Sequence, residues 1–129
     1  MKCTHIALQV RDQERSTEFY ERYCSMKIVH ERQTDDGRVV WLGWGEAPPR
    51  FVIVLLHGDY EQNAQPPWQH IGIAVESRAA VDAVYEQARG DGVEKLWPPN
   101  DAGPVAGYYC GLGDPDGNMI EFSHGQRLG

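Results

Sequence analysis

Apolar residues occupy every second position in two short stretches of the chain, residues 6–10 and residues 71–75. A period of two predicts a strand with one buried face. Behind each stretch the apolar spacing changes to three and four residues, which predicts an amphipathic helix. In the second helix these positions are Val81, Val84, Tyr85 and Ala88.

The sequence also marks the ends of the helices and the strands that follow. Asp12 and Ser77 are suitable N-caps, and Gly90 and Gly92 suit the end of the second helix. Three strand-like runs follow each helix: residues 27–31, 38–44 and 51–57 in the first half, and residues 94–96, 108–112 and 118–123 in the second. Turn-forming residues at 34–37 and 114–117 separate neighbouring strands.

The two halves of the chain therefore repeat the order β-α-β-β-β. Both begin with His-Ile, at His5 and His70, and both end with His-Gly, so that Glu121 aligns with Val54. Self-similarity of this kind predicts a pair of equivalent modules. We expect an α+β fold with module one at about residues 3–58 and module two at about residues 68–125, joined in a single domain.

Composition and charge narrow the classes of partner. The chain has 129 residues, enough for one hydrophobic core, and 19 acidic against 12 basic residues give a net charge of -7. The basic residues are scattered, which disfavours nucleic acid and anionic membranes as partners. Three dispersed cysteines without a CxxC motif, and no long apolar segment, favour a reducing cytoplasm.

Glu121 is the residue that most needs an explanation. Strand alternation places Met119, Glu121 and Ser123 on one face and Phe122 on the opposite face, which is the better candidate for packing under helices. A carboxylate on a buried face needs a partner to offset its desolvation. If the modules are related by a twofold axis, His5 and His70 face each other and Glu121 can be directed at the same point. By the same alternation, His57 and His124 point away, and His30 has no counterpart.

The paired modules, the histidine that opens each one and the segment DPDGNMIEF at residues 114–122 resemble the vicinal oxygen chelate superfamily. This superfamily includes glyoxalase I, methylmalonyl-CoA epimerase, fosfomycin-resistance proteins, extradiol dioxygenases and bleomycin-resistance proteins. The resemblance implies a glyoxalase-like fold, in which a curled mixed sheet carries its helices on the outer face. It also implies a homodimer and a small-molecule substrate.

Carried over to this sequence, the resemblance makes His5, His70 and Glu121 the ligands of a divalent metal ion, with Glu121 also catalytic. Two imidazoles and a carboxylate suit Zn, Ni, Mn or Fe(II) and leave coordination positions open. Several members have a fourth ligand at the position of Val54, so this ligand is expected to be absent here.

Further residues are candidates for contact with substrate. Gln9 shares a strand face with His5, and either Tyr108 or Tyr109 is expected to face the metal. The segment 97–107 is rich in Pro and Gly, is expected to be a loop, and is a candidate lid. The tryptophans that are expected to supply apolar walls are Trp41, Trp44 and Trp68.

Three kinds of function remain open at this point. The first is a metal-dependent lyase or isomerase of the glyoxalase kind, which is the leading hypothesis. The second is an extradiol-type Fe(II) dioxygenase, or more distantly a thiol transferase. The third is a non-catalytic protein that sequesters a ligand, as bleomycin-resistance proteins do.

Overall fold

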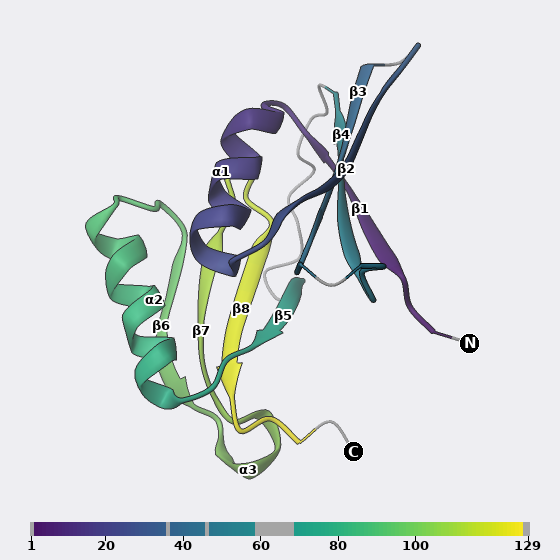
Figure 1. Ribbon diagram of the computed structural model, residues 1–129. Coiled ribbons are helices and arrows are strands. Elements are labelled where there is room, and N and C mark those ends of the chain that lie inside the picture. The colour runs from purple at the N-terminus through teal and green to yellow at the C-terminus, as the bar shows by residue number, and fades with distance from the viewer. Residues whose placement is uncertain (1, 36, 46, 59–68, 128–129) are drawn as a thin grey trace. The chain divides into compact units, whose positions relative to one another are not determined.

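The computed structural model describes residues 2–35, 37–45, 47–58 and 69–127 (Figure 1). The chain divides into two compact units, unit 1 at Met1–Asn63 and unit 2 at Ala64–Gly129. Trp68 and most of the connection between the predicted modules lie outside the described residues. None of the helices in the described ranges has the length and apolar character needed to cross a membrane.

Over its described residues, unit 1 forms a four-stranded mixed sheet with one helix. Its elements are β1 (His5–Val10), α1 (Gln13–Cys24), β2 (Lys27–Thr34), β3 (Gly37–Gly43) and β4 (Val52–His57). The strand order is β1-β4-β3-β2, in which β1 and β4 are parallel and the other pairs are antiparallel. Helix α1 packs against β2, β3 and β4.

Unit 2 repeats this arrangement. Its elements are β5 (His70–Ala74), α2 (Arg78–Gly90), β6 (Leu96–Asp101), α3 (Gly103–Ala106), β7 (Tyr108–Gly113) and β8 (Met119–His124). The order β5-β8-β7-β6 matches that of unit 1, with β5 and β8 parallel. Helix α2 packs against β6, β7 and β8. The predicted α+β class with two β-α-β-β-β modules is therefore confirmed.

The helices begin where the sequence predicts. The Asp12 carboxylate accepts a hydrogen bond from the backbone N–H of Arg15, and the Ser77 hydroxyl accepts one from that of Ala80. Both bonds satisfy donors that a helix start leaves unpaired. At the end of helix α1, Ser25 adopts the left-handed conformation, with φ 52°, that glycine usually takes at this position.

Strand β6 and helix α3 correct two predictions. The predicted strand at 94–96 is instead Leu96–Asp101, and the segment 97–107, expected to be a loop, contains this strand and the short helix Gly103–Ala106. Two prolines, Pro98 and Pro99, lie where the pairing register with β7 shifts. Proline lacks a backbone donor, so it is tolerated at the edge of a sheet and at a bulge, and β6 is an edge strand.

The hydrophobic core lies where each sheet meets its helix. Burial of these side chains is the main favourable contribution to the stability of each unit. As predicted, Phe122 belongs to the helix-covered face: it lies beside Cys110, whose thiol contacts the carbonyl of Val81 in α2. The largest fully buried side chains are Val10, Tyr20, Met26, Val40, Leu42, Ile53 and Leu55 in unit 1, and Val81, Cys110, Leu112, Ile120 and Phe122 in unit 2.

The turn before β8 is held by one side chain. The Oδ1 atom of Asp114 accepts hydrogen bonds from the backbone N–H groups of Asp116 and Asn118, at 3.0 and 2.8 Å. Its Oδ2 atom accepts one from the Asn118 side chain at 2.9 Å. Gly117 has φ +85°, a conformation that glycine adopts without a steric penalty. These bonds fix the position at which β8 begins, and thereby which of its residues share a face.

Candidate functional site

Glu121 lies on the face of the unit 2 sheet that α2 does not cover. In β8 it is flanked by Gly72 of β5 and Gly111 of β7, and it is only 6% exposed. Neither flanking residue has a side chain: beside Gly72 the nearest atom to an added Cβ would be Oε1 of Glu121 at 3.9 Å, whereas the space over Gly111 is filled by the ring of Trp97. A carboxylate with so little exposure requires polar partners.

The partners of Glu121 are His70 and Gln126. The Nε2 atom of His70 lies 3.5 Å from Oε2 of Glu121. The side-chain amide of Gln126 donates a hydrogen bond of 2.9 Å to the other oxygen, Oε1. Unit 2 thus brings together two of the three predicted metal ligands, and it adds a polar residue from beyond β8 that sequence analysis did not identify.

An indole ring lies beside this pair. The ring centroid of Trp97 is 5.7 Å from that of His70, with an interplanar angle of 82°. Gly111 permits this position, since a Cβ atom there would lie 2.4 Å from the Trp97 ring. The sequence signal for this contact is Gly111, the partner of Trp97 in the β6–β7 pair, but the Pro-rich segment around Trp97 predicts a loop and not a strand.

The two adjacent tyrosines of β7 lie on opposite faces of the sheet. Tyr109 pairs with Ser123 and so shares the face of Glu121, and its hydroxyl is 3.5 Å from the Asn100 side chain. Tyr108 lies on the helix side, where its hydroxyl donates a 2.6 Å hydrogen bond to Asp82 of α2. This hydrogen bond raises the pKa of Tyr108, because it stabilises the protonated phenol.

In unit 1, His5, Gln9 and Trp41 share the face of Val54. Val54 of β4 lies between two neighbours, Ala7 of β1 and Trp41 of β3. Ala7 comes two residues after His5, so both point to the same face of the sheet. His5 is exposed, and its Nδ1 atom is 3.1 Å from the hydroxyl of Thr4.

The other unit 1 candidates make contacts within their own unit. Trp41 packs on the cluster of Val39, Val52 and Val54. The side chain of Gln9 covers Gly58, where an added Cβ atom would collide with it. The Trp44 indole donates a 2.9 Å hydrogen bond to the carbonyl of Cys24 at the end of α1. No three His, Cys, Asp or Glu side chains are grouped to hold a metal ion among the residues that the structure describes.

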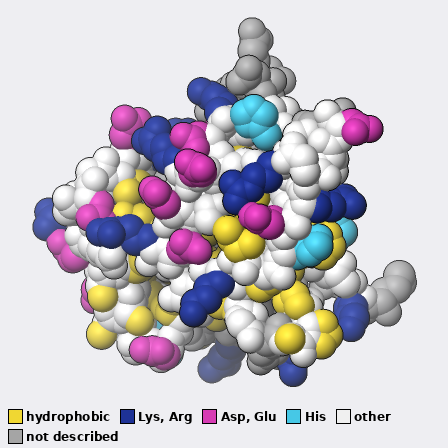
Figure 2. Space-filling view, turned by 45° about the horizontal axis from the view of Figure 1, so that its top comes forward, with side chains coloured by type: hydrophobic (Ala, Val, Ile, Leu, Met, Phe, Trp, Pro, Cys, Tyr) yellow, Lys and Arg dark blue, Asp and Glu magenta, His cyan; other side chains and the backbone are white. Residues whose placement is uncertain are grey.

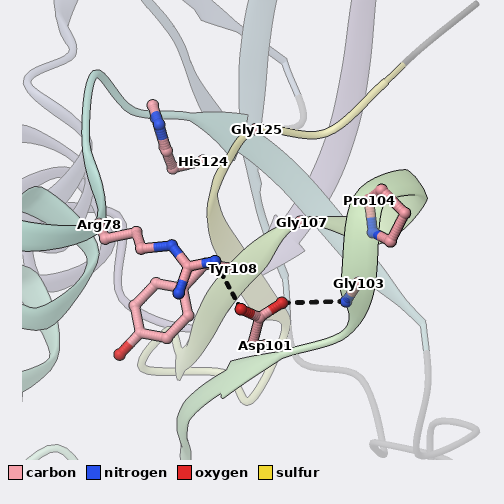
Figure 3. Close-up of a pocket in the computed structure, with 8 residues that line it drawn as sticks. All are labelled: Arg78, Asp101, Gly103, Pro104, Gly107, Tyr108, His124 and Gly125. Atoms are coloured by element: carbon pink, nitrogen blue, oxygen red, sulfur yellow. Dashed lines mark hydrogen bonds and ion pairs between the residues drawn. The ribbon is translucent and has the colours of Figure 1, made fainter.

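A pocket of about 530 Å³ opens in unit 2 beside Tyr108 (Figure 3). The guanidinium carbon of Arg78 lies over the Tyr108 ring, 4.9 Å from its centroid, and Arg78 forms an ion pair of 2.5 Å with Asp101. The lining residues are Arg78, Asp101, Gly103, Pro104, Gly107, Tyr108, His124 and Gly125. No sequence motif marked this pocket.

The charged groups of the pocket are already matched. The backbone N–H of Gly103 and the Arg78 guanidinium both donate to Asp101, and together they hold the pKa of its carboxyl below the usual range. The Nδ1 atom of His124 is 3.0 Å from the carbonyl of Val75. The pocket therefore presents a paired arginine and carboxylate rather than an unbalanced charge.

Comparison with known proteins identifies the family. The profile of the glyoxalase/bleomycin resistance protein/dioxygenase superfamily matches residues 2–122. The chain belongs to this superfamily. An uncharacterized protein of Pseudomonas aeruginosa is 41% identical over 127 residues, which cover 98% of this chain and 90% of its relative. Lactoylglutathione lyase of Neisseria meningitidis is 26% identical over 126 residues, covering 95% and 89% of the two chains.

The fold of this chain is similar to that of a solved structure. The fosfomycin resistance protein of Listeria monocytogenes, determined with Mn(II) and a dihydroxypropylphosphonic acid, has a TM-score of 0.76 at 20% identity, and the match covers 98% of this chain and 91% of that one. The glyoxalase/bleomycin resistance protein/dioxygenase superfamily includes metal-dependent enzymes, and its members often bind divalent metals.

The donor set of unit 2 fits such an ion. An imidazole and a carboxylate are suitable ligands for a borderline divalent metal, and the 3.5 Å separation of their donor atoms is compatible with both binding one ion. At the position of Glu121, unit 1 has Val54, which lacks a donor atom. Acidic and basic side chains of the described residues are intermingled in the view of Figure 2.

Proposed function

We propose that this protein is a metal-dependent, glyoxalase-like enzyme that acts on a small oxygen-bearing metabolite or xenobiotic. In this proposal His5, His70 and Glu121 hold a divalent ion. The observation that carries it is the 3.5 Å approach of His70 to the nearly buried Glu121 carboxylate. The Glu121 carboxylate has the imidazole of His70 on one side and the amide of Gln126 on the other, and an imidazole with a carboxylate is a donor pair suited to a borderline divalent ion.

The third ligand, His5, is proposed from the repeat. His5 and His70 are the first residues of β1 and β5. His5 lies two residues before Ala7, which pairs with Val54, and His70 lies two residues before Gly72, which pairs with Glu121. This equivalence and the family resemblance support His5. Imidazole, imidazole and carboxylate together leave open positions for a substrate.

The bound ion would act as a Lewis acid that polarises a substrate oxygen and stabilises negative charge developing on it. The protein's own residues would do the remainder. Glu121 would serve as a ligand in contact with the reacting centre, and Trp97 would supply an apolar wall beside His70. Tyr109 would present a hydroxyl donor from the same sheet face.

Two observations bear on the reaction. Similarity to lactoylglutathione lyases supports a lyase or isomerase, and it extends over 95% of the chain at 26% identity. Val54 in place of a fourth ligand departs from the glyoxalase I pattern and supports the three-ligand pattern of the extradiol dioxygenases and fosfomycin-resistance proteins. Activity on hemithioacetals with Ni, Zn or Mn would support the first, and oxygen-dependent activity on catechols with Fe(II) would support the second.

Metal analysis of the purified protein tests the proposal. We expect about one divalent ion per chain in the native protein and its loss in His70→Ala and His5→Ala. His57→Ala is the matched control, because His57 is an exposed histidine of β4 outside the proposed site. A native protein that binds no divalent ion would instead support a ligand-sequestering protein. The proposed homodimer is tested on the same samples by analytical ultracentrifugation.

A further inference from the structure

We infer that Gln126 is a positioning residue for Glu121: its side-chain amide holds one carboxylate oxygen so that the other is presented to the metal ion. The inference rests on the proposed function. It concerns a residue that lies beyond the last strand and beyond the matched family segment, which ends at residue 122.

The two oxygens of Glu121 have different partners. Oε1 accepts the 2.9 Å hydrogen bond from Nε2 of Gln126, while Oε2 lies 3.5 Å from Nε2 of His70. A primary amide is a neutral donor, so it can stabilise the carboxylate without competing as a cation for the same charge. With Oε1 occupied, the rotation of the carboxylate is restricted and Oε2 is the oxygen that remains available on the His70 side.

The backbone that carries Gln126 is also fixed. Gly125 adopts φ +78°, which turns the chain after β8, and the N–H of Arg127 donates a 3.1 Å hydrogen bond to the carbonyl of Val105 in α3. Gly107 lets this segment approach closely, because a Cβ atom there would lie 2.4 Å from the His124 carbonyl oxygen and 2.9 Å from the Gln126 nitrogen. Gln126 therefore reaches Glu121 from an anchored segment.

The anchoring of the segment that carries Gln126 determines how much the Gln126–Glu121 hydrogen bond contributes to metal affinity. Residues that hydrogen-bond a metal ligand fix its orientation, and their removal typically weakens metal binding by about 10- to 100-fold. Because the chain next to Gln126 is held by the hydrogen bond from the Arg127 N–H to the Val105 carbonyl, little additional ordering is needed when the ion binds. We expect loss of the Gln126 amide to weaken metal binding by about tenfold or more.

The test uses Gln126→Met, which preserves the size of the side chain but removes its donor. Gln87→Met is the matched control, because Gln87 is an exposed glutamine of α2 in the same unit. Zn²⁺ affinity is measured by competition with a chromophoric chelator, and the visible absorption spectrum of the Co²⁺ form reports the ligand geometry. In the metal-free protein, the side-chain amide resonances of Gln126 report the hydrogen bond directly, and Glu121→Ala should shift them.

We expect Gln126→Met to weaken Zn²⁺ binding at least about tenfold and to alter the Co²⁺ spectrum, with Gln87→Met unchanged. Wild-type Zn²⁺ binding that His70→Ala abolishes and Gln126→Met leaves unaltered would overturn this inference alone. A wild-type protein that binds no Zn²⁺ would overturn the proposed function together with the inference. Gln126 resonances that do not respond to Glu121→Ala would remove the hydrogen bond on which the inference depends.

Discussion

Val54 and Glu121 occupy equivalent positions in the two units. Val54 lies beside Ala7 in the parallel pair of β1 and β4, and Glu121 lies beside Gly72 in the parallel pair of β5 and β8. The same place in the repeat is therefore filled by an apolar side chain in one unit and by a carboxylate in the other. Glu121 has polar partners, whereas Val54 packs among valines, so a charged side chain is stabilised at residue 121 but not at residue 54.

This difference predicts the effect of placing a carboxylate in unit 1. Val54 is 8% exposed and packs with Val39 and Val52, so in the metal-free protein Val54→Glu should lower the free energy of unfolding by at least about 2 kcal/mol, because a charge is desolvated without a partner. Leu56→Glu is the control, since Leu56 lies two residues further along the same face and is 38% exposed. Urea denaturation measures both, and equal losses would contradict the prediction.

Two glycines of unit 2 allow backbone strain and crowding to be separated. Gly107 and Gly125 have nearly the same φ, +77° and +78°, but a Cβ atom would collide with backbone only at Gly107. Gly125→Ala should cost about 1 to 2 kcal/mol, the penalty of the left-handed conformation. Gly107→Ala should cost distinctly more, because the His124 carbonyl cannot move without disturbing the pairing of β8. Thermal unfolding of the two variants, followed by circular dichroism, checks their order.

The thiol of Cys110 should make stability depend on pH in the alkaline range. Burial, with smaller effects from Asp82 and Glu121, raises the pKa of Cys110 from 9.0 to about 12. The unfolded chain therefore releases this proton first, so the contribution of the thiol to stability is present below pH 9 and is lost as pH rises toward 12.

The measurement compares urea midpoints at pH 7 and pH 10. Wild type should lose more stability over this interval than Cys110→Ala, whose packing defect is present at both pH values. Cys3→Ala, which removes an exposed thiol, should follow wild type. Identical pH slopes for wild type and Cys110→Ala would contradict the assignment.

Asp101 should remain perturbed after its ion pair is removed. The first cause of its lowered pKa is the N–H of Gly103 and the second is Arg78, so Arg78→Gln should raise the pKa of Asp101 without restoring the ordinary value of 3.8. In wild type the stabilisation is present above pH 3.8 and is lost as pH falls through the folded-state pKa.

Carboxyl ¹³C titration by NMR follows Asp101 in both proteins. Arg89→Gln is the control, because it removes the ion pair with Glu86 at the other end of α2. This control should leave the pKa of Asp101 unchanged. Full recovery of the ordinary pKa in Arg78→Gln would show that the Gly103 hydrogen bond has no effect.

The sequence was sufficient for features that depend on local pattern and repetition. Alternation placed Phe122 under α2 and Glu121 on the opposite face, and the caps at Asp12 and Ser77 follow from the preference of helix starts for small polar acceptors. The correspondence of Val54 and Glu121 came from the repeat, since equivalent strands in equivalent modules share a register.

The features that were missed depend on pairing between distant segments. Pro98 and Pro99 suggested a loop, but an edge strand with a bulge accommodates both, and this is what brings Trp97 beside His70. Gln126 reaches Glu121 only because α3 anchors the segment after β8. Neither contact leaves a periodic signal in the sequence.

The residues of the turn around Asp114 serve the fold, and they do not determine which reaction the protein catalyses. The side chains of Asp114 and Asn118 bind each other, and Asp114 also binds the backbone, so the most distinctive motif of the sequence stabilises a turn. Glu121 takes no part in these hydrogen bonds, so a substitution at residue 121 leaves the bonds of the turn in place. Relatives that share this turn need not share a reaction, and the residue seven positions after Asp114 is a more informative guide to their chemistry than the turn itself.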